Sequence, residues 1–228
     1  MSRELAAGVW AMEGRASSVF LVADGDDLVL VDAGVPWDAG TIREGVRDAG
    51  FGLGDVDRVL VTHYDVDHVG ALAKLDDELE ATVYASDTDG RILTGERKPP
   101  LRGAKAVLTR FVSVPLVERP DLEVRFVGEG DTVGSFETFE TPGHTPGHLC
   151  FVSERLGVAL LGDLVSGNAD GSLGRVPRVF DGNRRRAGES IREFAERAPP
   201  FEVACMGHGE PLAAGGRDAL ADLAERLA

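Results

Sequence analysis

The sequence predicts an α/β fold in which two β-sheets pack face to face and helices cover their outer faces. Apolar runs of strand length outnumber helical runs early in each half of the chain, and helices finish each half, so the same order of elements occurs twice. A chain of 228 residues, of which 43% are hydrophobic, is long enough to bury a core of its own. We therefore expect one domain over residues 1–228, with a partly helical insert at about residues 86–120.

Strand and turn signals define the first half. Residues 18–23 and 28–33 are apolar runs on either side of an acidic, glycine-containing turn, a pattern typical of a β-hairpin. The next element is an expected helix over residues 37–49, which Gly50 ends. The half is then expected to continue with a buried strand at 58–61, a helix at 69–75 and a strand at 82–85.

The second half repeats this order after the insert, in which residues 104–111 have a helical pattern. An amphipathic helix is expected at 185–198, because Pro199 and Pro200 stop it there. The other elements expected in this half are strands at 123–127, 136–139, 149–152, 158–161 and 202–206, and a closing helix at 217–227.

The composition excludes several classes of function. With 39 acidic against 24 basic residues the net charge is −15, which disfavours binding to nucleic acid or to an anionic membrane surface. No apolar run approaches the roughly 18 residues of a membrane span, and residues 1–15 lack the pattern of a secretory signal, so we expect a cytoplasmic protein. Acid excess with scarce lysine resembles proteins of salt-accumulating organisms, although a GC-rich genome also favours arginine over lysine. Cys150 and Cys205 are too few for a disulfide scaffold and are expected to be buried reduced thiols.

The strongest chemical signal follows the apolar strand at 58–61. Within six residues the chain carries His63, Asp65, Asp67 and His68, which supply the imidazole and carboxylate groups that Zn, Fe and Mn accept. Repulsion between the two carboxylates would be costly unless a cation lies between them. Histidine is also scarce, with five in the chain, so two in one motif indicate a metal site.

Three further candidate ligands each follow an expected strand: His144, Asp163 and His208. Glycine stands beside these three, and it allows the backbone to turn sharply and to approach an ion closely. Polar groups gathered at strand ends form a site at the edge of a sheet. The sequence therefore predicts that four strand ends converge on one site.

In order and spacing, these motifs resemble the metallo-β-lactamase-fold superfamily of metallo-hydrolases, which includes glyoxalase II, acyl-homoserine lactonases, β-lactamases and RNase Z. The family motif His-x-His-x-Asp-His corresponds to residues 63–68, and its later His, Asp and His correspond to His144, Asp163 and His208. Residues 30–34 are similar to the family's early Asp-x-Gly turn. The resemblance covers about residues 17–211 and implies an αββα sandwich of two mixed sheets, with the metals at one edge of the sheets.

One position departs from the family motif. Asp65 stands where the family has its second His, which completes the first metal position with His63 and His144. The carboxylate could bind directly and give a harder site that tolerates Fe or Mn as well as Zn. It could instead reach the metal through water, or the protein could have lost one metal. We favour direct or near-direct ligation, because a buried Asp among ligands needs a cation partner.

The resemblance also implies a reaction. Asp67, His68 and His208 would hold a second ion, with Asp163 bridging the two. Two Zn ions are expected, with Fe or Mn as alternatives, and the nucleophile would be a metal-bound hydroxide that Asp67 holds in line. The expected function is a metal-dependent hydrolase that cleaves an ester-type bond in a small molecule, namely a lactone, a thioester or a simple ester. A homodimer is common in the family.

Two other functions stay open. A mononuclear iron oxygenase resembling persulfide dioxygenases would use His63, His144 and Asp163 as a facial triad, and a non-catalytic metal-binding domain is the other alternative. Only 20 residues follow His208, too few for the helical domain with which glyoxalase II holds glutathione, so a glutathione thioester is not the expected substrate. The short, acidic chain also disfavours RNase Z activity.

The sequence leaves the roles of several features open. His148 is expected to be a partly buried residue at the start of a strand, with a donor to a metal ligand as the alternative. Tyr64 could contact substrate or pack in the core. The basic segments 91–110 and 175–186 could steer an anionic substrate, a carboxylate or a phosphate, towards the site, or they could be solvated faces that pair with acids.

Overall fold

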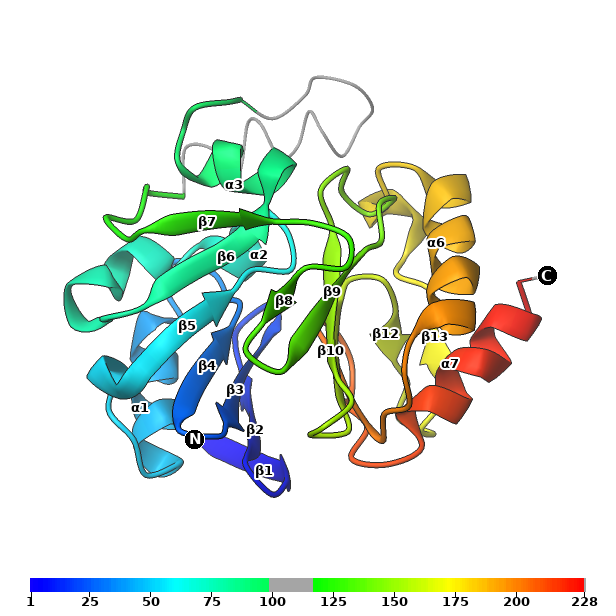
Figure 1. Ribbon diagram of the computed structural model, residues 1–228, viewed down its shortest axis with the longest axis horizontal. Coiled ribbons are helices and arrows are strands. Elements are labelled where there is room, and N and C mark those ends of the chain that lie inside the picture. The colour runs from blue at the N-terminus through cyan, green and yellow to red at the C-terminus, as the bar shows by residue number, and fades with distance from the viewer. Residues whose placement is uncertain (99–116, 228) are drawn as a thin grey trace.

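The computed structural model describes residues 1–98 and 117–227, and it confirms the expected pair of sheets with helices on their outer faces (Figure 1). The larger sheet has the strand order β1-β2-β3-β4-β5-β6-β7, antiparallel from β1 to β4 and parallel from β4 to β7. Its strands are β1 (Ser2–Ala6), β2 (Val9–Glu13), β3 (Ser18–Asp24), β4 (Asp27–Val31), β5 (Val56–Leu60), β6 (Thr82–Ser86) and β7 (Val124–Val127).

The second sheet has the order β14-β11-β10-β9-β8, with β14 and β11 parallel and the other pairs antiparallel. Its strands are β8 (Thr132–Val133), β9 (Phe136–Glu140), β10 (Leu149–Ser153), β11 (Val158–Gly162) and β14 (Val203–Met206). A short ribbon of β12 (Ser166–Gly167) and β13 (Leu173–Gly174) lies beside it. The helices are α1 (Ala39–Asp48), α2 (Val66–Val69), α3 (Asp87–Leu93), α6 (Arg184–Arg197) and α7 (Gly216–Glu225).

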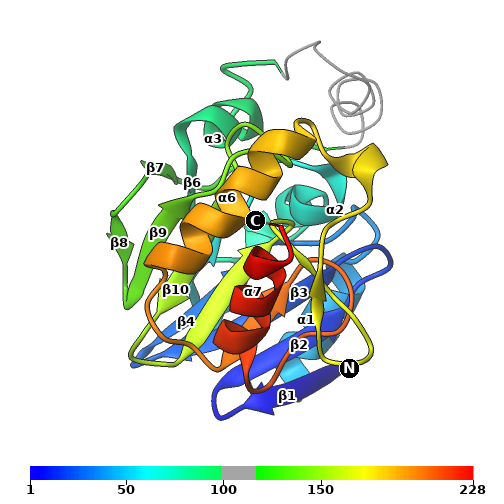
Figure 2. The ribbon, with the colours of Figure 1, turned by 90° about the vertical axis from the view of Figure 1, so that its right-hand side faces the viewer.

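Apolar side chains hold the layers together. The inter-sheet core includes Phe136 and Phe151, both fully buried, together with Leu60 of the larger sheet. Ile42 of α1 packs on the outer face of the larger sheet, and Phe194 of α6 on that of the second. Figure 2 shows α6 and α7 side by side over the second sheet. Because alternate residues of each strand point to opposite faces, one set of strands serves both the central core and the helices.

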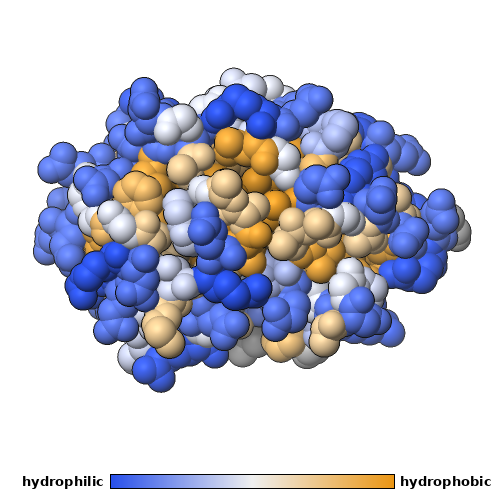
Figure 3. All heavy atoms as spheres, turned by 90° about the horizontal axis from the view of Figure 1, so that it is seen from below, coloured by the Kyte–Doolittle hydropathy of each residue, from blue (hydrophilic) through white to orange (hydrophobic). Residues whose placement is uncertain are grey.

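The lower end of the sandwich carries a band of apolar residues across its centre, flanked by hydrophilic side chains (Figure 3). The carboxyl ends of β4, β5 and β6 point away from this end (Figure 1). The candidate ligands follow such carboxyl ends, so they lie at the opposite edge of the sheets. None of the helices in the described part of the chain combines the length and the apolar character that crossing a membrane requires.

Most of the expected elements are present, and three differ for physical reasons. The strand expected at 123–127 is β7, and it pairs with β6 in the larger sheet rather than starting a second, separate half. Helix α1 begins at Ala39 rather than at residue 37, because the Asp38 carboxylate accepts hydrogen bonds from the N–H groups of Val35 and Arg15 and holds a turn there.

The helix expected at 69–75 is replaced by the four-residue α2 and a 3-10 turn at Leu72–Lys74. The N–H groups of Gly70 and Ala71 donate to the carbonyl oxygens of Gly34 and Ala33, across the chain, instead of to helix carbonyls. Strands β1 and β2 were not expected. The helical segment expected at 104–111 lies outside the described residues.

Candidate metal centre

The four strand ends named from the sequence converge. The loop after β5 carries His63 and Asp65, and the helix α2 that follows it carries Asp67 and His68. The loop after β9 carries His144, and Asp163 and His208 follow β11 and β14. The structure brings all seven candidate ligands together, in three overlapping groups whose ligand atoms lie within 4.8 Å of one another. The first group is His63, Asp65 and His144, and the second group is Asp67, His68 and His208. The remaining group, His63, His68 and Asp163, overlaps both.

Backbone hydrogen bonds tie the two sheets at this edge. The N–H of Leu149 donates to the carbonyl of Thr62 at 2.8 Å, and the N–H of Ser18 donates to the carbonyl of Gly207 at 2.8 Å. In each bond the carbonyl belongs to the residue just before a candidate ligand, and the N–H belongs to a residue of the other sheet. The ligand loops are therefore held by the sandwich itself.

The first group, His63, Asp65 and His144, surrounds the Asp65 carboxylate. Its Oδ2 lies 3.4 Å from Nε2 of His63 and 3.3 Å from Nε2 of His144. The two imidazole rings stand nearly perpendicular with centroids 4.8 Å apart. Asp65 thus faces the same point as the two histidines, as direct or near-direct ligation requires.

The second group, Asp67, His68 and His208, lies on the other side of Asp163. Nε2 of His208 is 3.4 Å from Oδ2 of Asp67. Asp163 reaches both groups: its Oδ2 is 3.2 Å from Nε2 of both His144 and His208, and its Oδ1 is 3.4 Å from Nε2 of His68. This is the placement expected of a bridging carboxylate.

Buried polar atoms without hydrogen bonds test whether these residues fit a metal. Nε2 of His63, Nε2 of His68 and Oδ1 of Asp163 are buried and have no hydrogen-bond partner among residues 1–98 and 117–227. Leaving a buried polar group unpaired costs about 1–3 kcal/mol. All three atoms face the cluster and are the atom types that a divalent cation binds. The residues present therefore fit divalent metal ions.

The electrostatics of the cluster follow from close packing of carboxylates and imidazoles. Burial and the neighbouring His68 lower the pKa of His63 to about 4. Burial also acts to lower the pKa of His68, but Asp163 and Asp32 outweigh it and raise that pKa well above its usual value. Hydrogen bonds with Asp163 and Asp67 raise the pKa of His208 to about 10. The carboxylates thus favour the protonated forms of His68 and His208, and metal binding to these rings would release protons.

Asp32, from the early Asp-x-Gly turn, orients one ligand. Its Oδ2 lies 2.8 Å from Nδ1 of His68 and accepts the hydroxyl hydrogen of Thr62 at 2.7 Å, and its Oδ1 accepts the N–H of Thr62 at 2.8 Å. Asp32 has φ +58°, a left-handed conformation that non-glycine residues rarely adopt. With Nδ1 of His68 engaged by a carboxylate, Nε2 is directed at the cluster.

His148 is fully buried rather than partly buried, and it contacts a candidate ligand's backbone. Its Nε2 accepts the N–H of Asp163 at 2.9 Å, and its Nδ1 lies 2.8 Å from the hydroxyl oxygen of Thr141. Burial and the neighbouring His63 lower its pKa well below the usual value, so the ring is neutral and can accept. The expectation of a partly buried strand residue is therefore corrected: His148 supports Asp163 as an acceptor, not as a donor.

Gly207 marks a close approach of backbone to the ligands. A Cβ atom at this position would overlap Oδ1 of Asp163 and lie 2.5 Å from Cε1 of His68. Only a residue without a side chain leaves this space free. The glycine beside His208 thus has a specific packing reason.

Asp181 is a residue that the sequence did not single out. Its side chain is buried, its Oδ1 lies 3.9 Å from Nδ1 of His144, and its Oδ2 accepts a hydrogen bond from Arg184 at 2.9 Å. Burial acts to raise its pKa, but His144 and Arg184 outweigh it and lower that pKa. The only signal available was an acid inside the basic segment 175–186.

The arginines of that segment are largely engaged by acids and carbonyls. Arg175 and Arg184 lie beside Asp181, Arg185 pairs with Glu189, and Arg186 pairs with Glu189 and Glu193. In the other basic segment Arg91 pairs with Asp87 and Glu96, while Arg102, Lys105 and Arg110 lie outside the described residues. Pairing of this kind is what the alternative of ordinary ion-paired faces predicts.

Tyr64, Cys150 and Cys205 lie in the core. Tyr64 is buried, and burial and the neighbouring Asp65 raise its pKa to about 12. Both cysteines are free, buried thiols in β10 and β14, as expected.

Comparison with known proteins agrees with this geometry. The family model described as the Metallo-beta-lactamase superfamily matches residues 12–208. The chain is 29% identical to the "Probable metallo-hydrolase YflN" of Bacillus subtilis, over 98% of this chain and 92% of that protein. It is 27% identical to a hydroxyacylglutathione hydrolase of Xanthomonas campestris, over 85% of this chain and 60% of that protein.

Solved structures show the same fold. A metallo-beta-lactamase of Cronobacter sakazakii, described by a HARLDQ motif, superimposes with a TM-score of 0.73 at 19% identity, over 99% of this chain and 90% of that one. At this identity the likeness shows the fold and carries no substrate with it.

Proposed function

Because the chain belongs to the metallo-beta-lactamase superfamily, we propose that it is a hydrolase with two metal ions that cleaves an ester-type bond in a lactone, a thioester or a simple ester. The observation that carries this proposal is the position of Asp163. Its two oxygens lie within 3.2–3.4 Å of imidazole nitrogens from both ligand groups. One carboxylate that reaches both groups supports a pair of ions.

In this proposal His63, Asp65 and His144 hold one ion, Asp67, His68 and His208 hold the other, and Asp163 is shared. Imidazole and carboxylate suit Zn²⁺, and the carboxylate of Asp65 makes the first group harder, so that Fe or Mn would also be tolerated there. When bound, such ions polarise a carbonyl group and lower the pKa of a water molecule from about 15.7 to about 7.

Burial of the ligand side chains indicates where substrate approaches. The side chains of His63 and His68 are fully buried, whereas those of Asp67 and His208 are 23% and 34% exposed. Asp67 and His208 thus form the accessible side. The Asp67 carboxylate can accept a hydrogen bond from the attacking water there and hold that water in line with the carbonyl carbon.

The choice of an ester-type bond is supported by the relatives named hydroxyacylglutathione hydrolases, of which the chain spans about 60% of the length. The substrate of those proteins is not carried over. An anionic substrate remains part of the proposal, to be tested by turnover of an anionic ester against a neutral analogue at low and high salt. Faster turnover of the anionic ester that salt suppresses would support steering; equal, salt-independent turnover would contradict it.

The decisive experiment is metal content of anaerobically purified protein, measured beside a panel of lactones, thioesters and simple esters. Two Zn or Mn ions per chain with hydrolysis of a panel member would support the proposal. One Fe per chain with oxygen consumption would replace it by the oxygenase. Bound metal without turnover would favour a non-catalytic metal-binding domain.

A further inference from the structure

Asp89 is a buried carboxylate outside the candidate ligands. It lies in the first turn of α3 and is 3% exposed. Its Oδ2 accepts the backbone N–H of Tyr64 at 3.1 Å and the hydroxyl hydrogen of Thr145 at 3.1 Å. One oxygen atom therefore joins two loops that are 81 residues apart in the chain.

The two donors are the immediate neighbours of ligands of the first group. Tyr64 stands between His63 and Asp65, and Thr145 follows His144 directly. The first loop leaves β5 of the larger sheet, and the second leaves β9 of the other sheet. Asp89 thus connects the two sheets at the point where the first group is assembled.

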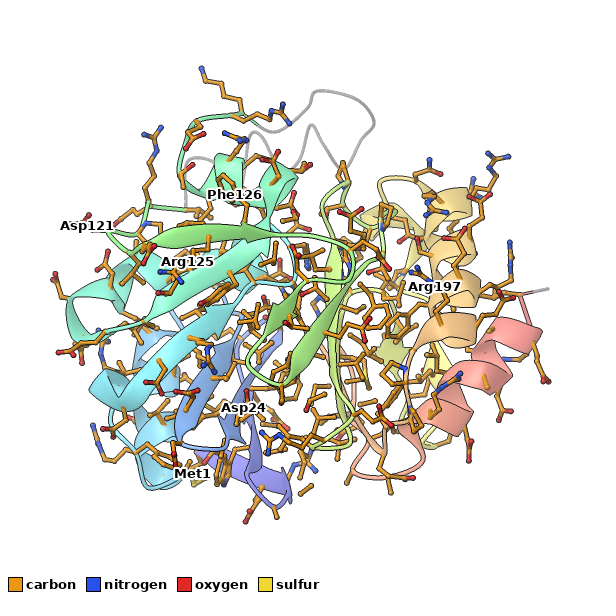
Figure 4. All side chains as sticks on the ribbon, viewed as in Figure 1. Met1, Asp24, Asp121, Arg125, Phe126 and Arg197 are labelled. Carbon is orange, nitrogen blue, oxygen red and sulfur yellow. The ribbon has the colours of Figure 1, made fainter. Side chains whose placement is uncertain are left out.

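Asp89 is itself held in place. Its N–H donates to the hydroxyl of Ser86, which caps α3, and Phe126 of β7 packs against α3 near Gly90 (Figure 4). The Arg91 guanidinium lies 4.9 Å above the centre of the Phe126 ring. The loop that carries His144 also approaches Asp89, since a Cβ on Gly147 would lie 2.7 Å from Oδ1 of Asp89. A carboxylate anchored in this way can define a distance between two loops.

We propose that Asp89 is a positioning residue that sets the separation of His63 and Asp65 from His144, and through it the metal affinity of the first group. It does this without touching the metal. The inference rests on the proposed function in one respect, namely that the two groups hold metal. Asp32 is the counterpart for the second group, because it acts on His68.

Removing the Asp89 carboxylate would break the hydrogen bonds that hold the two loops at a fixed separation. The buried N–H of Tyr64 and the hydroxyl of Thr145 would lose their common acceptor, and the loops would shift to find other partners. A metal site tolerates small errors in ligand position poorly, so that changes behind the ligands typically cost about 10–100-fold in metal affinity. The effect should fall on the first group alone.

The test is zinc titration of the metal-free full-length protein, with one group removed at a time. In a His208→Ala background, which retains the first group, Asp89→Ala should weaken zinc binding by about 10–100-fold. In a His144→Ala background, which retains Asp67, His68 and His208, the same change should leave zinc affinity within about twofold. A merely structural role would weaken both.

A variant at Thr145 tests the same proposal if Asp89→Ala does not fold. Thr145→Val removes one of the hydrogen bonds described at Oδ2 of Asp89, at nearly constant volume, so it should weaken zinc binding by the first group by a smaller factor. Thr145→Ser should restore that binding. The matched control is Asp87→Ala, in the same turn of α3 but on its exposed side, where Asp87 pairs with Arg91. It should leave both affinities unchanged.

Two outcomes would overturn the inference. One is that folded Asp89→Ala leaves the zinc affinity of the first group unchanged. If Asp89→Ala does not fold, the same result in Thr145→Val counts instead. The other is an equal loss in both backgrounds. Neither depends on hydrolysis, whereas absence of zinc binding by the unmodified protein would contradict the proposed function first.

Discussion

Asp32 and His68 form a buried pair in which the carboxylate Oδ2 lies 2.8 Å from Nδ1 of the imidazole, 36 residues away in the chain. The pair joins the turn after β4 to helix α2, whose His68 is a ligand of the second group. Because Asp32 also accepts two hydrogen bonds from Thr62, beside His63, one carboxylate fixes the loop and the ring together.

Replacing Asp32 by Asn should weaken zinc binding by the second group by about 10–100-fold, because an amide no longer favours the Nδ1–H form of His68 so strongly. Zinc titration of the metal-free protein measures this. Asp57→Asn is the control, since Asp57 also accepts a backbone N–H, from Leu28, but lies at the start of β5 away from the ligands. Equal affinities for Asp32→Asn and the control would show that His68 needs no carboxylate.

Asp65→His should bind zinc at least as tightly as the unmodified protein. The Asp65 carboxylate lies 3.3–3.4 Å from Nε2 of His63 and His144, and a histidine there would complete the family motif. The metal content after purification from medium with equal Zn, Fe and Mn should shift towards Zn, since imidazole is the softer ligand. A sharp loss of zinc would show that the space is shaped for a carboxylate.

Gly207→Ala should abolish binding at the second group while leaving the fold intact. The added methyl group would overlap Asp163 and approach His68 to 2.5 Å, so one of these ligands must move. The measurement is zinc stoichiometry together with the circular dichroism of the metal-free variant. Gly40→Ala in α1, where an added Cβ meets no atom within 4 Å, is the control and should bind as the unmodified protein does. Full stoichiometry in Gly207→Ala would contradict the close approach.

Asp24 ties the sheets together near the end away from the ligands (Figure 4). Its carboxylate accepts the N–H of Ser135 at 2.9 Å and hydrogen-bonds with Arg155, and Arg58 lies 3.6 Å away. Asp24→Asn should therefore lower the free energy of unfolding at pH 7 by about 1–2 kcal/mol. Exposed Asp26→Asn in the same turn should have little effect.

The difference in free energy of unfolding between Asp24→Asn and the unmodified protein should change with pH in a definite direction. Burial acts to raise the pKa of Asp24, but the hydrogen bonds from Ser135 and Arg155 outweigh it and hold that pKa below the usual 3.8. The ionised carboxylate thus stabilises the fold at and above pH 4, and this contribution is lost as the pH falls through the folded-state pKa. Urea unfolding of the metal-free protein from pH 7 to pH 3 should show the gap between Asp24→Asn and the unmodified protein closing at the acid end. A gap that widens there would be contrary to this assignment.

Local patterns predicted the elements better than their pairing. The strand at 123–127 can be predicted from the local sequence, but its pairing with β6 cannot, because β6 and β7 are almost forty positions apart in the chain. The expected helix at 69–75 fails for a similar reason, since Gly70 and Ala71 bond to a distant loop that no local window contains.

The amino-acid sequence was enough to predict which chemical groups meet, because imidazoles are few and each candidate ligand follows an apolar strand whose carboxyl end must lie at a sheet edge. The carboxylates that support those ligands could be identified from the folded arrangement alone. The buried side chains of Asp32, Asp89 and Asp181 contact candidate ligands or the residues next to them, through partners far along the chain. Solvent exclusion at a packed edge is a property of the assembled layers, and no stretch of chain encodes it alone.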